Sequence, residues 1–74
     1  MSLYRLAKSV SESYGLLHVA NLRALRFYIK TTSEEQLLEG VAKIDETALL
    51  RTLWEAGLSS GLQDAVLERL EKLT

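Results

Sequence analysis

Residues 16–30 read LLHVANLRALRFYIK, and this stretch decides the expected fold. Its apolar residues surround almost the whole circumference of a helix and do not alternate as those of a half-buried strand do. An element that is apolar on most sides is normally the central one, with neighbours on several faces. Phe27, Tyr28 and Ile29 are strand formers, so a short strand at the end of the segment is the alternative. We predict a central helix over residues 16–30.

Arg23, Arg26 and Lys30 form the main polar strip of this predicted helix. Their spacing of i, i+3 and i+7 places three cations along one edge. Charge is distributed asymmetrically along the chain. Residues 1–30 carry five cations and one acid, a net charge of +4. Residues 31–74 carry four cations and nine acids, a net charge of −5. Such asymmetry indicates a partner, or two halves that pack on each other.

The segment before residue 15 predicts a second amphipathic helix, over residues 3–14. One stripe of this helix is apolar and consists of Leu3, Leu6, Ala7, Val10 and Tyr14. Gly15 follows the stripe, at the position where helices commonly end with a glycine. We therefore expect a helix, a tight stop and then the helix of residues 16–30.

The segment after residue 30 predicts three further helices. Ser33 begins a capping box with Gln36 and precedes the apolar stripe Leu37, Leu38, Val41 and Ile44. The stripe changes phase at Ile44-Asp45, which indicates a break with Asp45 as the next N-cap. Gly57 is the expected end of the fourth helix, and Ser60 with Gln63 forms a second capping box. Apolar positions between these signals, Trp54 included, are expected to face the core.

Together these patterns predict an all-α protein with a single domain over residues 1–74, a compact orthogonal or antiparallel bundle of about five short helices. The chain has no cysteine and one histidine, so it has no disulfide, and neither a thiolate nor a His-rich metal site is expected. No secretory signal is visible, and no apolar run reaches the ~20 residues needed to cross a bilayer. We expect a cytoplasmic protein that does not enter the membrane and carries no cofactor.

Residues 41–51 read VAKIDETALLR and residues 64–70 read DAVLERL. On these two stretches, residues 41–74 resemble a divergent HEAT-like helical repeat. An offset of 43 residues also aligns several apolar positions of the two halves, together with Arg26 and Arg69. The resemblance implies a stub of two stacked helix pairs. The family normally stacks at least three units, so a stub of two departs from its pattern.

No catalytic constellation is visible, so an enzyme is not expected. The sequence has no cysteine nucleophile and no phosphate-binding glycine loop, and Gly57–Gly61 is a helix–helix turn rather than a nucleophile elbow because no strand precedes it. His18 lies between apolar neighbours and is expected to be a partly buried ring with one hydrogen bond. A pH-sensitive contact is the alternative for this histidine.

The preferred function is protein–protein contact, as a small adaptor or a self-associating homodimer. The apolar surplus of residues 16–30 is more than two or three short neighbours can cover. The candidate interaction residues are Arg23, Arg26, Lys30 and Trp54, the last because tryptophan is enriched at interface hot spots. The alternative is a small nucleic-acid-binding protein that uses the basic residues Arg5, Lys8, Arg23, Arg26 and Lys30. Pairing of the basic residues within the chain or between subunits is preferred over nucleic acid.

Overall fold

The computed structural model describes residues 2–74, and within them the protein is all-α, as predicted. Five helices follow one another without a strand: α1 (Leu3–Ser11), α2 (Gly15–Thr31), α3 (Glu34–Lys43), α4 (Thr47–Ala56) and α5 (Ser60–Leu73). The strand-forming end of the central segment is helical, because α2 continues without interruption to Thr31. The predicted number and order of helices are therefore confirmed.

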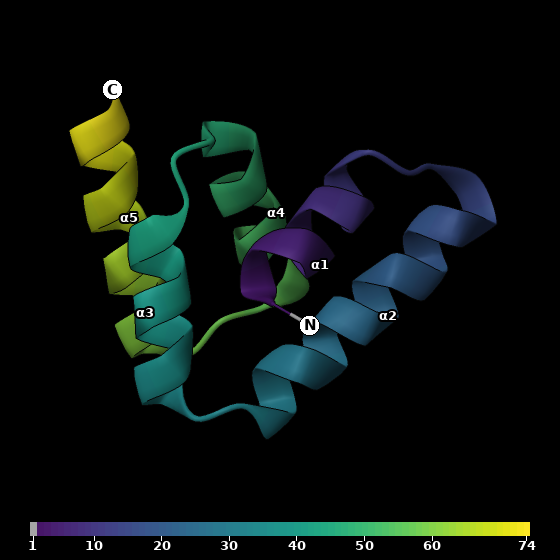
Figure 1. Ribbon diagram of the computed structural model, residues 1–74, viewed down its shortest axis with the longest axis horizontal. Coiled ribbons are helices and arrows are strands. Elements are labelled where there is room, and N and C mark those ends of the chain that lie inside the picture. The colour runs from purple at the N-terminus through teal and green to yellow at the C-terminus, as the bar shows by residue number, and fades with distance from the viewer. Residues whose placement is uncertain (1) are drawn as a thin grey trace.

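The helices form three layers (Figure 1). Helix α2 lies on one side, α1 and α4 lie in the middle, and α3 and α5 lie together on the other side. Helix α1 contacts α2, α3 and α4, whereas α2 contacts the rest of the protein mainly through α1 and, to a smaller extent, α4. The expectation that residues 16–30 form the central helix is therefore wrong, and α1 is the central helix.

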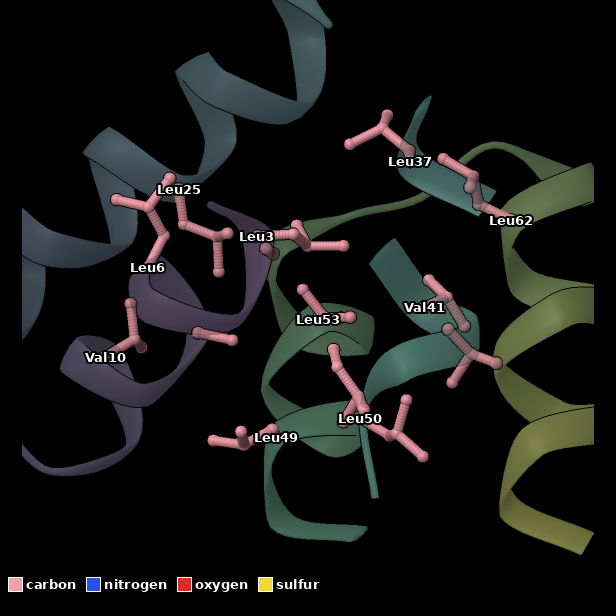
Figure 2. Close-up of a cluster of buried hydrophobic side chains, with 14 residues drawn as sticks. Leu3, Leu6, Val10, Leu25, Leu37, Val41, Leu49, Leu50, Leu53 and Leu62 are labelled. Atoms are coloured by element: carbon pink, nitrogen blue, oxygen red, sulfur yellow. The ribbon is translucent and has the colours of Figure 1, made fainter. Parts of the chain in front are cut away.

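The composition of the core explains why α1, which is shorter than α2, takes the central position. Four side chains of α1 are buried, namely Leu3, Leu6, Ala7 and Val10, whereas Leu25 is the only buried side chain of α2 (Figure 2). The rest of the core comes mainly from α4, with contributions from α3 and α5. Because α1 presents a compact apolar stripe and the small, fully buried Ala7, other helices can approach it from several sides.

Helix α3 approaches α1 closely at Gly40. A methyl group added at Gly40 would lie 3.0 Å from Cδ2 and 3.2 Å from Cβ of Leu3. Glycine lowers the intrinsic stability of a helix by about 1 kcal/mol relative to alanine. Here the missing side chain allows α1 and α3 to approach each other closely.

Helix α1 ends three residues earlier than predicted. It stops at Ser11, and Tyr14 is 88% exposed at the N-cap of α2 instead of lying in the buried stripe. The Ser11 and Ser13 hydroxyls donate hydrogen bonds to the carbonyls of Lys8 and Val10, at 3.0 and 3.2 Å. Such local bonds compete with helix continuation, which explains the early end.

The N-caps of α4 and α5 are each shifted by one residue from the predicted positions. The N-cap of α4 is Glu46 rather than Asp45, and its side chain makes no capping hydrogen bond because its carboxylate accepts one from Tyr4. The N-cap of α5 is Ser59 rather than Ser60, and its hydroxyl donates to Glu34 Oε1 at 2.8 Å.

The stop predicted at Gly15 is wrong, because Gly15 is the first residue of α2, with a φ of 68°. Two other predicted helix signals are confirmed. Ser33 accepts a hydrogen bond from the backbone N–H of Gln36 at 3.3 Å, as its place in the capping box predicts. Gly57 ends α4 with a φ of 94°, a conformation that glycine adopts without steric cost.

Two leucines of α2 test this orientation of the helix. Leu25→Ala removes a fully buried side chain, so we expect the free energy of unfolding to fall by about 2–5 kcal/mol. Leu16→Ala is the matched control, because Leu16 is 89% exposed and its truncation is expected to change stability by no more than about 0.5 kcal/mol. Urea denaturation measures both values, and similar losses for the two variants would contradict the orientation.

Candidate interaction surface

The side of α2 that points away from the protein is largely apolar. We call it the outer face of α2, and it consists of Leu16, Val19, Ala20, Arg23, Phe27 and Lys30, all exposed. Leu16 is 89%, Phe27 68% and Val19 52% exposed. Residues at i, i+4, i+7 and i+11 share one side of a helix, so Leu16, Ala20, Arg23 and Phe27 form a single ridge.

The opposite side of α2 fixes the helix on the protein. Leu25 is buried there, and Leu22, Tyr28 and Ile29 pack against the core while remaining partly exposed. The amide of Asn21 donates hydrogen bonds to the backbone carbonyl of Ser9 at 3.3 Å and to the hydroxyl of Ser13 at 3.1 Å. These contacts determine which side faces inward, and the outer face has no neighbouring helix within residues 2–74.

His18 is part of this attachment. Its Nδ1 lies 3.0 Å from the carbonyl oxygen of Val10 and 3.2 Å from that of Ser13. Because both partners are acceptors, Nδ1 carries the proton and donates to them. The half-buried ring thus satisfies carbonyls where α1 ends, which agrees with the structural role expected for this histidine.

The three predicted cations lie together on α2 but have different surroundings. Arg26 Nε donates a hydrogen bond to the carbonyl oxygen of Ala56 at 3.2 Å, where a cation also complements the negative end of the α4 dipole. Arg23 and Lys30 make no ion pair or side-chain hydrogen bond with any described residue. The single ion pair in the described part of the chain joins Lys72 and Glu68, 3.9 Å apart, within α5. The expected pairing of oppositely charged residues within the chain is therefore absent at Arg23 and Lys30, and pairing between subunits stays a prediction.

Lys8 belongs to a separate polar cluster on α1. Its Nζ lies 5.5 Å from the centroid of the Tyr4 ring and donates to the Tyr4 hydroxyl at 3.4 Å. That hydroxyl in turn donates to a carboxylate oxygen of Glu46. The hydrogen bond to Glu46 raises the pKa of Tyr4, and the hydrogen bond to Tyr4 raises the pKa of Lys8. Lys8 is thus held near an acid of the other half of the chain.

Trp54 lies apart from the cations, on α4. Its side chain is 42% exposed, so the expectation that it packs in the core is wrong. Leu49, Leu50 and Leu53 fill the buried side of α4, and the position of Trp54 turns it toward solvent. Its role as a contact residue remains a prediction.

The far side of the protein carries a second surface that the sequence did not reveal as a site. We call it the acidic face, and it consists of Glu35 and Glu39 on α3 and of Asp64, Glu68 and Glu71 on α5, all exposed. An open groove runs between the two helices. Its apolar lining is Leu38, Val41, Ala42 and Ala65, and its charged lining is Glu68, Arg69 and Lys72. Leu38 was predicted to be buried but is 39% exposed at this groove. The negative charge of residues 31–74 was the only sequence signal for this surface.

Two classes of site receive no support from the described residues. Residues 2–74 contain no group of three or more His, Asp or Glu side chains placed to hold a metal ion. No helix among them is long and apolar enough to span a bilayer.

Compared with protein-family models, curated proteins and solved structures, the chain shows no significant similarity to any. The HEAT-like resemblance of residues 41–74 therefore stays a prediction. An all-α fold does not test it, because amphipathic helix pairs occur in many unrelated helical proteins.

The cluster of Tyr4, Lys8 and Glu46 gives a titration test of the structure. In the wild-type protein we expect the pKa of Tyr4 to lie above its ordinary value of 10.0, because ionisation breaks the hydrogen bond to the Glu46 carboxylate. Glu46→Ala removes this cause and leaves Lys8, which favours the phenolate, so the pKa of Tyr4 should fall. NMR signals of the Tyr4 ring followed against pH measure the change, with Glu35→Ala as the control. An equal pKa in wild type and Glu46→Ala would contradict the contact.

Proposed function

We propose that this protein is a protein–protein interaction module without catalytic activity, and that it binds its partner through the outer face of α2. The observation that carries the proposal is the exposure of Leu16, Val19 and Phe27 on one side of a single helix. Burial of apolar surface is the main favourable contribution to protein association.

The composition of the outer face supports this function. Aromatic residues and arginine are enriched at protein interfaces, and Phe27 and Arg23 lie next to each other on the outer face. A helix of 17 residues is about 26 Å long, which is sufficient for several turns of contact with a partner. The unpaired cations Arg23 and Lys30 would add specificity at the margin of the contact.

The partner that we favour is a second copy of the chain, and a homodimer is the simplest form. A protein of 74 residues buries a small core, and self-association is one of the ways in which small domains gain stability. We also propose a cytoplasmic location, because a chain without cysteine suits a reducing compartment.

Nucleic-acid binding is the weaker alternative. It would use Arg5 and Lys8 together with the cations of α2, but Lys8 contacts Tyr4 near Glu46, and Arg26 donates to a backbone carbonyl. The remaining cations of α2 are separated by the apolar Phe27. A phosphate-binding surface needs several available cations in one track, and its affinity falls steeply as salt rises.

Self-association through the outer face can be tested by molecular mass. We expect the mass of the wild-type protein to rise from the 8.3 kDa of one chain as concentration increases, in light scattering or sedimentation equilibrium. Phe27→Asp should shift this transition to at least tenfold higher concentration, because about 1.4 kcal/mol corresponds to tenfold and burying an unpaired carboxylate costs more.

The control for this experiment is Ala48→Asp, which adds the same charge at an exposed position of α4 and should leave the transition unchanged. Moderate salt should shift the association transition only slightly. By contrast, the same salt strongly weakens the binding of a protein to the phosphate groups of a nucleic acid. A wild-type protein that remains monomeric up to about 1 mM, the range of the weakest specific contacts, would contradict self-association.

A further inference from the structure

We propose that the outer face of α2 binds the acidic face of a second copy, so that copies associate head to tail. This inference rests on the proposed function and names the partner surface. Three features of the structure support it: the charges of the two faces, the groove between α3 and α5, and the positions of the two faces on opposite sides of the protein.

The charges of the two faces are complementary. Helix α2 carries three cations and no acid, whereas α3 and α5 together carry six carboxylates and three cations. Of these carboxylates, Glu34 accepts a hydrogen bond from Ser59, and Glu68 lies 3.9 Å from Lys72. Glu35, Glu39, Asp64 and Glu71 have no ion-pair partner among the described residues. Unpaired cations on one side and unpaired carboxylates on the other are what a head-to-tail contact requires.

The groove of the acidic face provides an apolar surface for a helix. Leu38, Val41, Ala42 and Ala65 contribute its apolar lining, and Leu38 is exposed there. An amphipathic helix binds in such a groove through apolar residues spaced three, four and seven positions apart. The ridge of Leu16, Ala20 and Phe27 has this kind of spacing. Arg69 and Lys72 also line the groove, and Lys72 lies 3.9 Å from Glu68. The cations of α2 would therefore pair with carboxylates of α3 and α5 that lie outside the groove lining.

Two other occupants of the outer face fit the charges less well. If two copies of α2 packed on each other, Arg23 and Lys30 would face a helix that contains no acid, and the acidic face would stay unpaired. A nucleic acid would meet Arg23 and Lys30 but would leave Leu16 and Val19 in contact with a highly charged backbone. Only the acidic face of a second copy supplies both carboxylates and an apolar groove from this chain itself.

The positions of the two faces determine the kind of assembly. Helix α2 lies at one side of the protein, and α3 and α5 lie side by side at the other (Figure 1). A contact between two different surfaces is heterologous, so each bound copy still offers one free face. Assembly therefore continues to a closed ring or an open chain, and the homodimer is its first step.

Two complementary variants test the head-to-tail contact. The first, Leu16→Ser with Phe27→Ser, removes the ridge of α2 and keeps the acidic face. The second, Leu38→Lys with Glu68→Lys, blocks the acidic face and keeps α2. All four positions are exposed, so both variants should fold, and circular dichroism checks this.

Light scattering measures the molecular mass of each variant alone and of their equimolar mixture. The samples are at a concentration where the wild type assembles. We expect each variant alone to remain at 8.3 kDa and the mixture to form a complex of twice that mass, because only one productive contact remains.

If the second variant dimerises alone and does not bind the first, α2 pairs with α2, and the head-to-tail contact is wrong while self-association through α2 stands. If both variants assemble like the wild type, the head-to-tail contact and the proposed role of the outer face are both wrong. A monomeric wild type contradicts self-association and this inference together.

Discussion

The packing of α1 against α2 on one side, α3 on the other and α4 beside it in the middle layer is the interaction on which the rest of the structure depends. Its stripe from Leu3 to Val10 is short, but Ala7 and the neighbouring Gly40 let other helices approach closely. Because α1 occupies the middle, α2 meets the protein with one side only. The longest helix of the chain therefore retains an uncovered apolar ridge.

The same arrangement keeps the opposite charges of the chain apart. The cations of α2 lie on one side of the protein, and most carboxylates of α3 and α5 lie on the other, with the middle layer between them. The two halves are thus in contact through a shared apolar core and a few hydrogen bonds rather than through ion pairs. These hydrogen bonds include those from Lys8 through Tyr4 to Glu46 and from Arg26 to the Ala56 carbonyl. A chain that is nearly neutral overall thereby presents two oppositely charged surfaces to the solvent.

The sequence predicted the fold class, the number of helices and the cap at Ser33, because these depend on local patterns. It did not predict which helix lies in the centre, since the apolar surplus of residues 16–30 says nothing about how many neighbours are available. The sequence also did not predict the early end of α1. There the Ser13 hydroxyl donates a hydrogen bond to the Val10 carbonyl, and such a side-chain bond competes with continuation of the helix. The cations of α2 were found as a group, whereas the acidic face was missed because its residues come from two helices separated in sequence.

Exposure of the outer face of α2 in the isolated chain is the central claim, and methyl NMR with a soluble paramagnetic probe tests it most directly. In a dilute sample the methyl groups of Leu16 and Val19 should relax strongly, whereas those of Leu25 should not, because Leu25 is fully buried. As the protein is concentrated, Leu16 and Val19 should become protected. Equal protection of Leu16 and Leu25 in the most dilute sample would contradict the account.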